Sequence, residues 1–546
     1  MDLTIYLKEN IIKCLKQIEP NLSFELSDII IENSKDPAHG DYASNAAMKY
    51  CKTFKTNPRT LAEKIVELID KERIEKIEIA GPGFINFFMK NDSLTSILPF
   101  IINSGDNFGK GEKKNKKINV EFVSANPTGD LHVGHARGAA IGDSICRILS
   151  FAGYDITREY YINDAGNQIN NLGYSLIERY KEISGLDYKL PEDGYHGEDV
   201  KKIAEIIKNS VTFDPLKLNE KEQLEFFKKE GIRLELDKII KVLNEFGVKF
   251  DVFSSEIEIR KNNAVEKEIE FLKPHSYLDD GAIKLKTTDY LDDKDRVIVK
   301  KDGSYTYFLP DIVYHVNKIS RGYDLLIDVL GADHHGYINR MKSALMMHGY
   351  SKDSLEIELI QMVRIMKDGE EIKASKRTGN AITLQELIDE VGKDATRYFF
   401  SMRAASMHLD FDLNLAKEQS SSNPVYYAQY AHARLSRVLE LGEKAGINLD
   451  LDNIMDLTSV SEISLLKIIN EFPKEVNNAA NERAPYKIAN YIHRLAEAIH
   501  AFYTECKIVD KDNIMLSNSR LILSKASKIV MKNALDLLGV TALNKM

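Results

Sequence analysis

The fold of this chain is decided by the stretch Val120-Glu-Phe-Val-Ser-Ala-Asn-Pro-Thr-Gly-Asp-Leu-His-Val-Gly-His135. It begins as an apolar strand, continues as a polar turn, and ends in a His-Val-Gly-His step into an expected helix from Ala136 to Leu149. Nucleotide phosphates are held where a strand passes into a helix, because free backbone N–H groups and the helix dipole favour anions. His132 and His135 could then donate hydrogen bonds to phosphate oxygens.

A four-residue motif is weak when it stands alone, since a polar helix start would have the same residues. A second motif lies downstream, in the polar, cation-rich loop Met366-Lys-Asp-Gly-Glu-Glu-Ile-Lys-Ala-Ser-Lys-Arg-Thr-Gly-Asn380. Lys373, Ser375 and Lys376 form a Lys-x-Ser-Lys pattern that suits the β- and γ-phosphates of ATP. The alternative for this loop is a solvated charged turn. The two motifs together favour an ATP site.

Strands and helices alternate on both sides of the first motif. After the strand 118–123 and its helix come a strand at Asp155–Ile162 and a further helix from Asp164. This succession predicts a parallel sheet of the Rossmann type. A charged, helix-rich insertion occupies about 170–290, and the sheet is expected to resume at Leu325–Gly331.

Two further regions flank this core. The chain begins with an amphipathic helix and two strands around Gly81-Pro-Gly83, which indicates an α+β module. A basic linker at 109–117 ends it, and from about Asn423 the chain is nearly all helical. We therefore expect four regions: 1–110, the catalytic domain 111–360, a signature-loop region 361–422, and a helical domain 423–546.

Composition sets broad limits. The chain has 546 residues, of which 43% are hydrophobic and 29% charged, which is typical of a globular protein with several domains. No apolar run is long enough to span a bilayer, and the start lacks the layout of a signal peptide. The four cysteines are scattered, which argues against a zinc site or disulfides and fits a reducing cytoplasm. The formal charge of −9 alone would favour an enzyme without an RNA partner.

The two motifs carry a family resemblance. His132-Val-Gly-His135 and Lys373-Ala-Ser-Lys-Arg377 resemble the HIGH and KMSKS signatures of class I aminoacyl-tRNA synthetases. The longer segments 121–138 and 159–168 resemble arginyl-tRNA synthetase, and its bacterial form most closely. The resemblance runs along essentially the whole chain. Ala374 stands where the family usually has methionine, and we expect this difference to affect packing only modestly.

The resemblance implies a multidomain α/β plus α fold. It consists of a Rossmann-type catalytic core with both signatures, an N-terminal α+β module that contacts the tRNA elbow, and a C-terminal all-helical anticodon-binding domain. The implied function is arginine–tRNA ligase, which activates L-arginine with Mg²⁺–ATP and transfers it to tRNA(Arg). The resemblance also implies a cytoplasmic enzyme, often a monomer, without a membrane segment or a tightly bound protein metal. For the N-terminal module, a scaffold without RNA contact is the alternative.

The resemblance assigns roles to individual residues. His132, His135, Lys373 and Lys376 would be catalytic. ATP would be bound by the turn and helix start of the first motif and by the second motif, at Asn126, Pro127, Thr128, Gly129, His132, Gly134, His135, Ser375 and Lys376. The substrate's α-amino and α-carboxylate groups would be held by Asn126 and His132.

A guanidinium group favours carboxylates in bidentate geometry and an aromatic face, and this predicts the arginine pocket. Tyr307 and Asp311 lie four residues apart at the start of a helical stretch, on one face. By resemblance they stack on and pair with the guanidinium, and Glu121 and Ser124 join them. Asp333 follows a strand end and would contact the α-amino group or the ATP ribose. The alternatives are a helix cap for Asp311 and strand packing for Tyr307.

Aromatic and polar side chains alternate in Asn423-Pro-Val-Tyr-Tyr-Ala-Gln-Tyr-Ala-His-Ala-Arg434. Tyr427, Gln429 and Arg434 could therefore contact unstacked RNA bases, although a helix that buries its tyrosines is an even alternative. His334 and His335 lack acidic or cysteine partners at metal-ligand spacing, so we expect a polar loop there.

Two other functions stay open from sequence alone. The chain could be another class I synthetase or a nucleotidyltransferase with a different small substrate, because the histidine motif is widely shared. It could also be a non-catalytic tRNA-binding paralogue, although both signatures retain their histidines and lysines.

Overall fold

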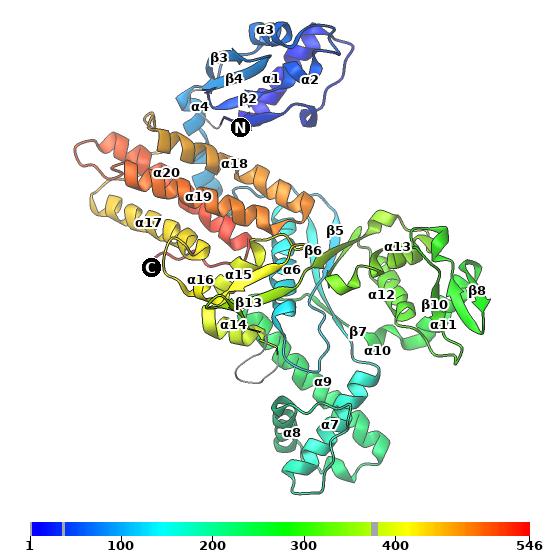
Figure 1. Cartoon of the computed structure of the whole chain (residues 1–546). Helices are drawn as coiled ribbons and strands as arrows, with labels where there is room; N and C mark the ends of the chain where they lie inside the picture. The colour runs from blue at the N-terminus through cyan, green and yellow to red at the C-terminus, as the bar shows by residue number, and fades with distance from the viewer. Residues whose placement is uncertain (1–2, 35–38, 373–380) are drawn as a thin grey trace.

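A five-stranded parallel sheet forms the centre of the computed structural model, which describes residues 3–34, 39–372 and 381–546 (Figure 1). The strands lie in the order β12-β11-β5-β6-β7 and every neighbouring pair is parallel. Their bounds are β5 Lys117–Glu121, β6 Asp155–Ile162, β7 Val252–Ser255, β11 Leu325–Gly331 and β12 Leu355–Ile360. The predicted Rossmann-type sheet is confirmed, and β6 and β11 have the expected bounds.

The order of the strands determines where a ligand can bind. From β5 the chain adds β6 and β7 on one side, and it later returns to place β11 and β12 on the other side. The order therefore reverses between β5 and β11. In open α/β sheets, the crevice at the carboxyl ends of the strands on either side of such a reversal binds ligands.

Helix α6 (Val133–Phe151) covers β5 and is packed tightly against it. The strand buries Ile118, Val120 and the following Phe122 almost completely. A Cβ atom on Gly142 of α6 would lie 2.4 Å from Cγ of Phe122, so the helix can approach this closely only because residue 142 is glycine.

The expected insertion is divided by a strand. After β6 the chain forms α7 (Asn167–Ile183), α8 (Glu198–Ser210) and α9 (Glu220–Glu245), which pack around a small core of their own and project from one end of the molecule (Figure 1). It then returns to the sheet as β7 and leaves it again. The second excursion contains α10 (Glu256–Ile259), α11 (Ala264–Leu272) and an antiparallel sheet of β8 (Ser276–Asp279), β9 (Ala282–Leu285) and β10 (Arg296–Val299). Helices α12 (Phe308–Ser320) and α13 (Tyr337–Met347) follow.

The N-terminal module is an antiparallel sheet with helices, as predicted. Strands β1 (Ile31–Asn33), β2 (Tyr42–Ser44), β4 (Phe84–Met89) and β3 (Ile74–Ala80) lie in this order, and β3 and β4 flank the Gly-Pro-Gly turn. Helices α1 (Leu3–Ile18), α2 (Ala46–Tyr50) and α3 (Pro58–Leu68) complete it, and α4 (Asn91–Thr95) and α5 (Ile97–Ser104) lead to β5. The module lies at the end of the molecule opposite α7–α9 (Figure 1). Its Asp41 forms an ion pair of 2.8 Å with Lys467 of α18.

The C-terminal region is a bundle of long helices, as predicted. It contains α17 (Pro424–Lys444), α18 (Val460–Glu482), α19 (Pro485–Glu505) and α20 (Ile514–Leu537). Between it and the parallel sheet lie β13 (Val363–Lys367), β14 (Glu370–Glu371), α14 (Leu384–Val391), α15 (Lys393–Ser401), β15 (Leu409–Asp412) and α16 (Leu413–Lys417). One hydrophobic core runs from the N-terminal module through the sheet into these helices. In the described residues no helix combines the length and apolar character that a bilayer span requires.

Candidate active site

A cavity of about 980 Å³ opens at the carboxyl ends of β5, β6 and β11, where the strand order reverses. Its polar lining comes from the ends of β5, β6 and β11 and the segments that follow them, and from the starts of α6, α12 and α13. The lining includes Glu121, Ser124, Asn126, His132, Gly134, His135, Tyr161, Asn163, Asp311, Tyr314, His315, Asp328, Asp333 and Tyr337. The predicted crevice is therefore present, and most of the residues in its wall are polar.

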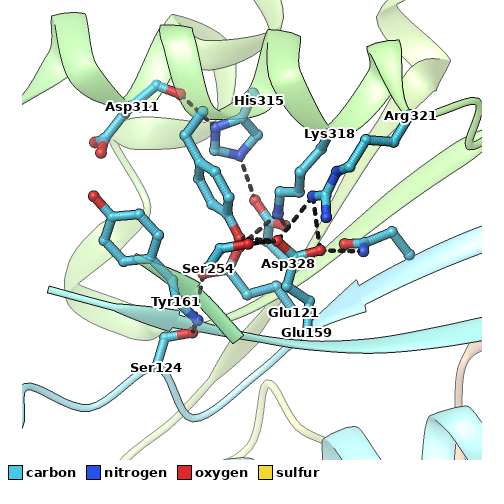
Figure 2. A network of polar contacts seen from close by, with 12 residues as sticks. Glu121, Ser124, Glu159, Tyr161, Ser254, Asp311, His315, Lys318, Arg321 and Asp328 are labelled. Atoms are coloured by element: carbon cyan, nitrogen blue, oxygen red, sulfur yellow. Dashed lines mark hydrogen bonds and ion pairs between the residues drawn. The ribbon is translucent and has the colours of Figure 1, made fainter. Parts of the chain in front are cut away.

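The backbone directly after β5 is strained. Val123 has a φ of 68° and Ser124 a φ of 38°, and left-handed backbone is unfavourable for a β-branched residue such as valine. The turn carries the Ser124 hydroxyl to a position where it donates to Glu121 Oε1 over 3.0 Å and accepts from the Tyr161 N–H over 3.0 Å (Figure 2). The strained turn thus fixes one oxygen of the Glu121 carboxylate at the cavity wall.

The two signature histidines lie side by side at the start of α6. Their ring centroids are 3.8 Å apart in a stacked arrangement. His132 is the N-cap residue of α6, and its Nδ1 accepts from the Gly134 N–H over 3.1 Å. Because Nδ1 is the acceptor, the proton of a neutral His132 lies on Nε2, which is free to donate to a ligand. In the part of the chain that the structure describes, Nδ1 of His135 is buried without a hydrogen-bond partner.

Both histidines favour the neutral form. Burial lowers the pKa of His132 from its ordinary value. Burial and the neighbouring His132 lower the pKa of His135 to about 4. Near neutral pH both rings therefore offer N–H donors rather than positive charge. At this site the cations that a triphosphate requires must come from other residues.

The segment that follows the second signature is held against the first. The Val133 N–H donates to the Ile382 carbonyl over 3.1 Å, and the Leu384 N–H donates to the Leu131 carbonyl over 2.7 Å. Lys373, Ser375 and Lys376 lie outside the described residues. The residues that directly follow the undescribed segment, Ile382 to Leu384, lie beside the His-Val-Gly-His step.

Helix α12 presents a row of polar side chains to the strand ends. Asp311, His315 and Lys318 follow one another at helical spacing, so they lie on one face, and Figure 2 shows them along the helix above the strands. Tyr314 lies on the same side, with its ring centroid 4.7 Å from that of Tyr161. The cavity therefore has carboxylates and an aromatic wall, which is the combination that a guanidinium favours.

A buried ionic network lies beneath these carboxylates (Figure 2). Lys318 Nζ donates to Glu121 Oε2 over 2.5 Å and to Asp328 Oδ1 over 2.8 Å. His315 bridges the Asp311 carbonyl and Asp328 Oδ2, at 2.7 Å from each. Beside them, Glu159 accepts from Arg321, Tyr314, Ser254 and Asn119. Each buried charge therefore has a partner, as burial requires.

Among the described residues, no lysine or arginine forms an ion pair with the Asp311 carboxylate. Burial is the main cause that raises its pKa to about 7, and Glu121 and Glu256 raise it further, whereas His315 and Tyr337 act in the opposite direction. A carboxyl group with such a pKa is partly protonated near neutral pH. A cation that enters the cavity would favour its ionised form.

Comparison with known proteins agrees with this geometry. Three family models match: the arginyl tRNA synthetase N-terminal domain at residues 6–89, the class I (R) tRNA synthetase catalytic domain at 97–438, and the DALR anticodon binding domain at 428–546. Arginine–tRNA ligase of Bacillus subtilis is 51% identical over 96% of this chain and 95% of its own. That of Bacillus pumilus is 49% identical over 99% and 98%. The chain belongs to the arginyl-tRNA synthetase family.

Solved structures share the fold of this arginyl-tRNA synthetase chain. The arginyl-tRNA synthetase of Thermus thermophilus superposes with a TM-score of 0.75 over 99% of both chains, at 20% sequence identity. That of Plasmodium falciparum gives a TM-score of 0.77 over 100% of this chain and 99% of the other, at 19% identity. At such identities the likeness concerns the fold, which extends through all parts of the synthetase.

The structure brings most of the predicted site residues together. Glu121, Ser124, Asn126, His132, Gly134, His135, Asp311 and Asp333 all line the one cavity. Pro127, Thr128 and Gly129 do not line it; they form the turn behind Asn126, in which the Thr128 N–H donates to the Asn126 carbonyl over 2.8 Å. Their predicted contribution to ATP binding is thus limited, in this arrangement, to shaping the loop that carries Asn126.

Tyr307 lies apart from the other residues predicted for the arginine pocket. Its side chain is 88% exposed and does not line the cavity, so its stacking on the guanidinium stays a prediction. Helix α12 begins at Phe308, and helical side chains lean toward the N-terminus, so the ring of Tyr307 projects beyond the first turn rather than over Asp311. The aromatic wall of this cavity is instead formed by Tyr161, Tyr314 and Tyr337.

Sequence reasoning missed Tyr161, Tyr314, His315, Asp328 and Tyr337 in the lining, and Lys318 behind it. The signal for three of them was present in α12, because Tyr314, His315 and Lys318 follow Asp311 by three, four and seven residues. The positions of Asp328 and Tyr161 in the lining follow from the pairing of strands instead. Asp328 is the partner of Glu121 in the β5–β11 register, and no local pattern announces this.

The residues predicted to contact tRNA lie in α17, where packing uses much of their surface. Gln429 is only 7% exposed, and its amide donates to Asp394 Oδ2 and to the Thr541 carbonyl. These hydrogen bonds give Gln429 a structural contact, and its predicted contact with tRNA stays untested. Arg434 donates to His500 and lies over the rings of Tyr430 and Tyr503, and Tyr427 packs against His493 and His500. Tyr427 and Arg434 keep some exposure, so their contact with tRNA stays a prediction.

The described residues contain no group of three or more His, Cys, Asp or Glu side chains that could hold a metal ion. His334 and His335 are exposed; His334 lies 3.6 Å from Asp333 and has its ring edge-on to that of Tyr337. The four cysteines are buried and unpaired, as small apolar residues would be.

Proposed function

We propose that the cavity binds arginine with its guanidinium at Asp311 and Glu121, and ATP beside His132, His135 and the start of α6. As an arginine–tRNA ligase, the enzyme joins the two and then passes arginine to tRNA. One observation carries the proposal. The carboxylates that suit a guanidinium and the neutral histidines that suit a phosphate open into one cavity, at the point where the strand order reverses.

In the first step, a carboxylate oxygen of arginine attacks the α-phosphorus of ATP. The bond to the β-phosphate bridging oxygen breaks, which gives arginyl-adenylate and pyrophosphate. The N–H groups of His132 and His135 would donate to oxygens that gain charge in the transition state, and Lys373, Ser375 and Lys376 would neutralise the leaving pyrophosphate. Mg²⁺ would enter with ATP, held chiefly by its phosphates.

In the second step, the 2′-hydroxyl of the terminal adenosine of tRNA attacks the carbonyl carbon of arginyl-adenylate, and AMP leaves. No covalent intermediate on the enzyme is required, so the protein contributes positioning and charge stabilisation. Asn126 and His132 would hold the α-amino and α-carboxylate groups, and Asp333 would contact the α-amino group or the ATP ribose, since all three line the cavity.

The other parts of the chain would bind the rest of the tRNA. We assign residues 1–110 to the tRNA elbow, 361–422 to support of the signature loop, and 423–546 to the anticodon, with Tyr427 and Arg434 as contacts. The enzyme would act as a monomer in the cytoplasm. Light scattering after size-exclusion chromatography tests this directly, and a mass of two chains would refute it.

Pyrophosphate exchange with each amino acid, with and without tRNA, tests the reaction. Arginine should give exchange in the presence of tRNA(Arg), and [³²P]pyrophosphate should enter ATP. Exchange with a different amino acid would indicate another synthetase or a nucleotidyltransferase. Tight tRNA binding with no exchange under any condition would indicate a non-catalytic paralogue.

A further inference from the structure

The feature that carries a further inference is Lys318, a fully buried lysine behind the wall of the cavity. Its ammonium lies between the carboxylates of Glu121 and Asp328. These two residues are direct partners in the parallel pairing of β5 with β11, so their side chains project from neighbouring strands at the same level. Lys318 itself does not line the cavity, whereas both carboxylates do.

The ammonium uses its hydrogen-bonding capacity within the protein. Nζ donates over 2.5 Å to Glu121 and over 2.8 Å to Asp328, and it lies 4.6 Å from the ring centroid of Tyr314. An ammonium has three donors and no acceptor, so little capacity remains for a ligand. Lys318 therefore acts on a substrate only through the groups that it holds.

Glu121 is held from two sides. Lys318 donates to Oε2, the Ser124 hydroxyl donates to Oε1, and the Tyr314 hydroxyl contacts the same carboxylate. The carboxylate is thereby fixed in one orientation where it lines the cavity. Without the ammonium, two carboxylates on adjacent strands would face each other in a buried place, and one would take up a proton or turn away.

We propose that Lys318 is a positioning residue for the arginine site: its ammonium occupies the inner side of the Glu121–Asp328 pair and so presents an ionised Glu121 to the substrate guanidinium. The inner side of the pair is then closed to any substrate cation. The planar guanidinium meets Glu121 from the outer side, where Asp311 provides the second carboxylate. This inference rests on the proposed placement of arginine in the cavity.

The variant Lys318→Ala provides a direct test, because it removes the atoms of n-propylammonium from a closed space. Arginine affinity, measured by equilibrium dialysis, should fall about tenfold or more. Added n-propylammonium should restore it in a saturable manner. 1-Propanol, which has nearly the same shape but no charge, should not. Equal restoration by the alcohol would show that Lys318 only fills space, and would overturn the proposal.

Two further variants keep the test decisive if Lys318→Ala folds poorly. Lys318→Met retains the shape without charge and should also bind arginine about tenfold or more weakly. Lys318→Met with Asp328→Asn removes both members of an ion pair, a change that buried pairs often tolerate. In this double variant no second carboxylate faces Glu121, but Glu121 Oε2 has still lost the donor that orients it, so arginine binding should stay weak. Recovery of wild-type affinity would show that Lys318 merely balances Asp328, and would overturn the inference.

Glu121→Gln separates failure of the inference from failure of the site. If Glu121→Gln binds arginine like the wild type, the proposed placement of arginine is wrong. If Glu121→Gln weakens binding while Lys318→Met stays within about twofold of the wild type, the placement stands and the role of Lys318 is refuted.

Discussion

Asp311 should couple arginine binding to the release of a proton. Its pKa is raised to about 7, chiefly by burial, so much of the ligand-free enzyme carries a neutral carboxyl group at that pH. The arginine guanidinium is cationic at every relevant pH and pairs with the ionised form. Binding must therefore expel the proton, and arginine affinity should fall as the pH falls below 7.

The size of the effect follows from the pKa. With one proton released, the dissociation constant of arginine should be about tenfold higher at pH 6 than at pH 8, since it changes by a factor of about ten per pH unit below the pKa. In Asp311→Asn this dependence should disappear. Affinity at pH 8 should fall roughly a hundredfold, because one buried charged partner is lost, which corresponds to about 3 kcal/mol.

The same substitution should stabilise the protein without substrate. A raised pKa in the folded state means that stability is lost as the pH rises from the unfolded pKa through about 7. Asp311→Asn lacks the carboxylate and avoids this loss, so its free energy of unfolding should exceed that of the wild type by as much as a few kcal/mol at pH 8 and hardly at pH 4.

Isothermal titration calorimetry in buffers of different ionisation enthalpy measures both the affinity and the number of protons released. Asp353→Asn is a matched control, since Asp353 is exposed and does not line the cavity. A dissociation constant that is flat between pH 6 and pH 8 in the wild type would refute the reasoning. So would an Asp311→Asn variant that keeps the pH dependence.

Three other predictions concern the ATP side and the domain contacts. His135→Ala should lower the rate of adenylate formation, measured by single-turnover kinetics, about 10²-fold. His135→Asn should recover part of the lost rate, because the imidazole of His135 acts as a neutral donor and an asparagine amide can also donate. An equal loss of rate in both variants would contradict that role. Lys376→Ala should slow adenylate formation far more than it weakens arginine binding, and an unchanged rate in pyrophosphate exchange would refute its assignment to the leaving group. Arg397→Met should lower the free energy of unfolding, measured in urea titrations, by about 3–5 kcal/mol. The substitution removes a fully buried guanidinium that donates to the carbonyls of Leu538 and Phe246 and to Asp143. A change below 1 kcal/mol would show that these contacts contribute little.

Sequence alone predicts the long elements of this fold well. The strands at 155–162 and 325–331 have the predicted bounds. The second is a largely apolar run that is buried over most of its length, as is typical of a central strand in a parallel sheet. Strand β7 was not predicted. It has four residues within a charged region, and it exists only because it pairs with the end of β6. A strand of this length carries too little local pattern to be distinguished from a loop.

The candidate site likewise has residues that the sequence predicts and residues that it does not. Residues that adjoin the first signature were predictable, because a strand end followed by a helix start places them at a ligand crevice. Tyr307 shows the limit of spacing arguments. Its distance of four residues from Asp311 places both at the start of α12, yet only Asp311 lines the cavity and the ring of Tyr307 is exposed.

Gln429 shows a second limit of prediction from sequence: the pattern does not tell whether a polar side chain of a helix faces solvent or another part of the protein. The alternation of aromatic and polar residues in α17 is typical of RNA-binding surfaces, but it equally suits a helix that joins two parts of a protein. Here Gln429 donates to Asp394 of α15 and to the Thr541 carbonyl near the C-terminus. Arg397 of the same α15 reaches the end of α20 and Asp143 of α6, the helix that begins after His132. The polar side chains of this region therefore hold the C-terminal helices against the catalytic helix. Any tRNA contact of α17 must come from the side that Gln429 does not face.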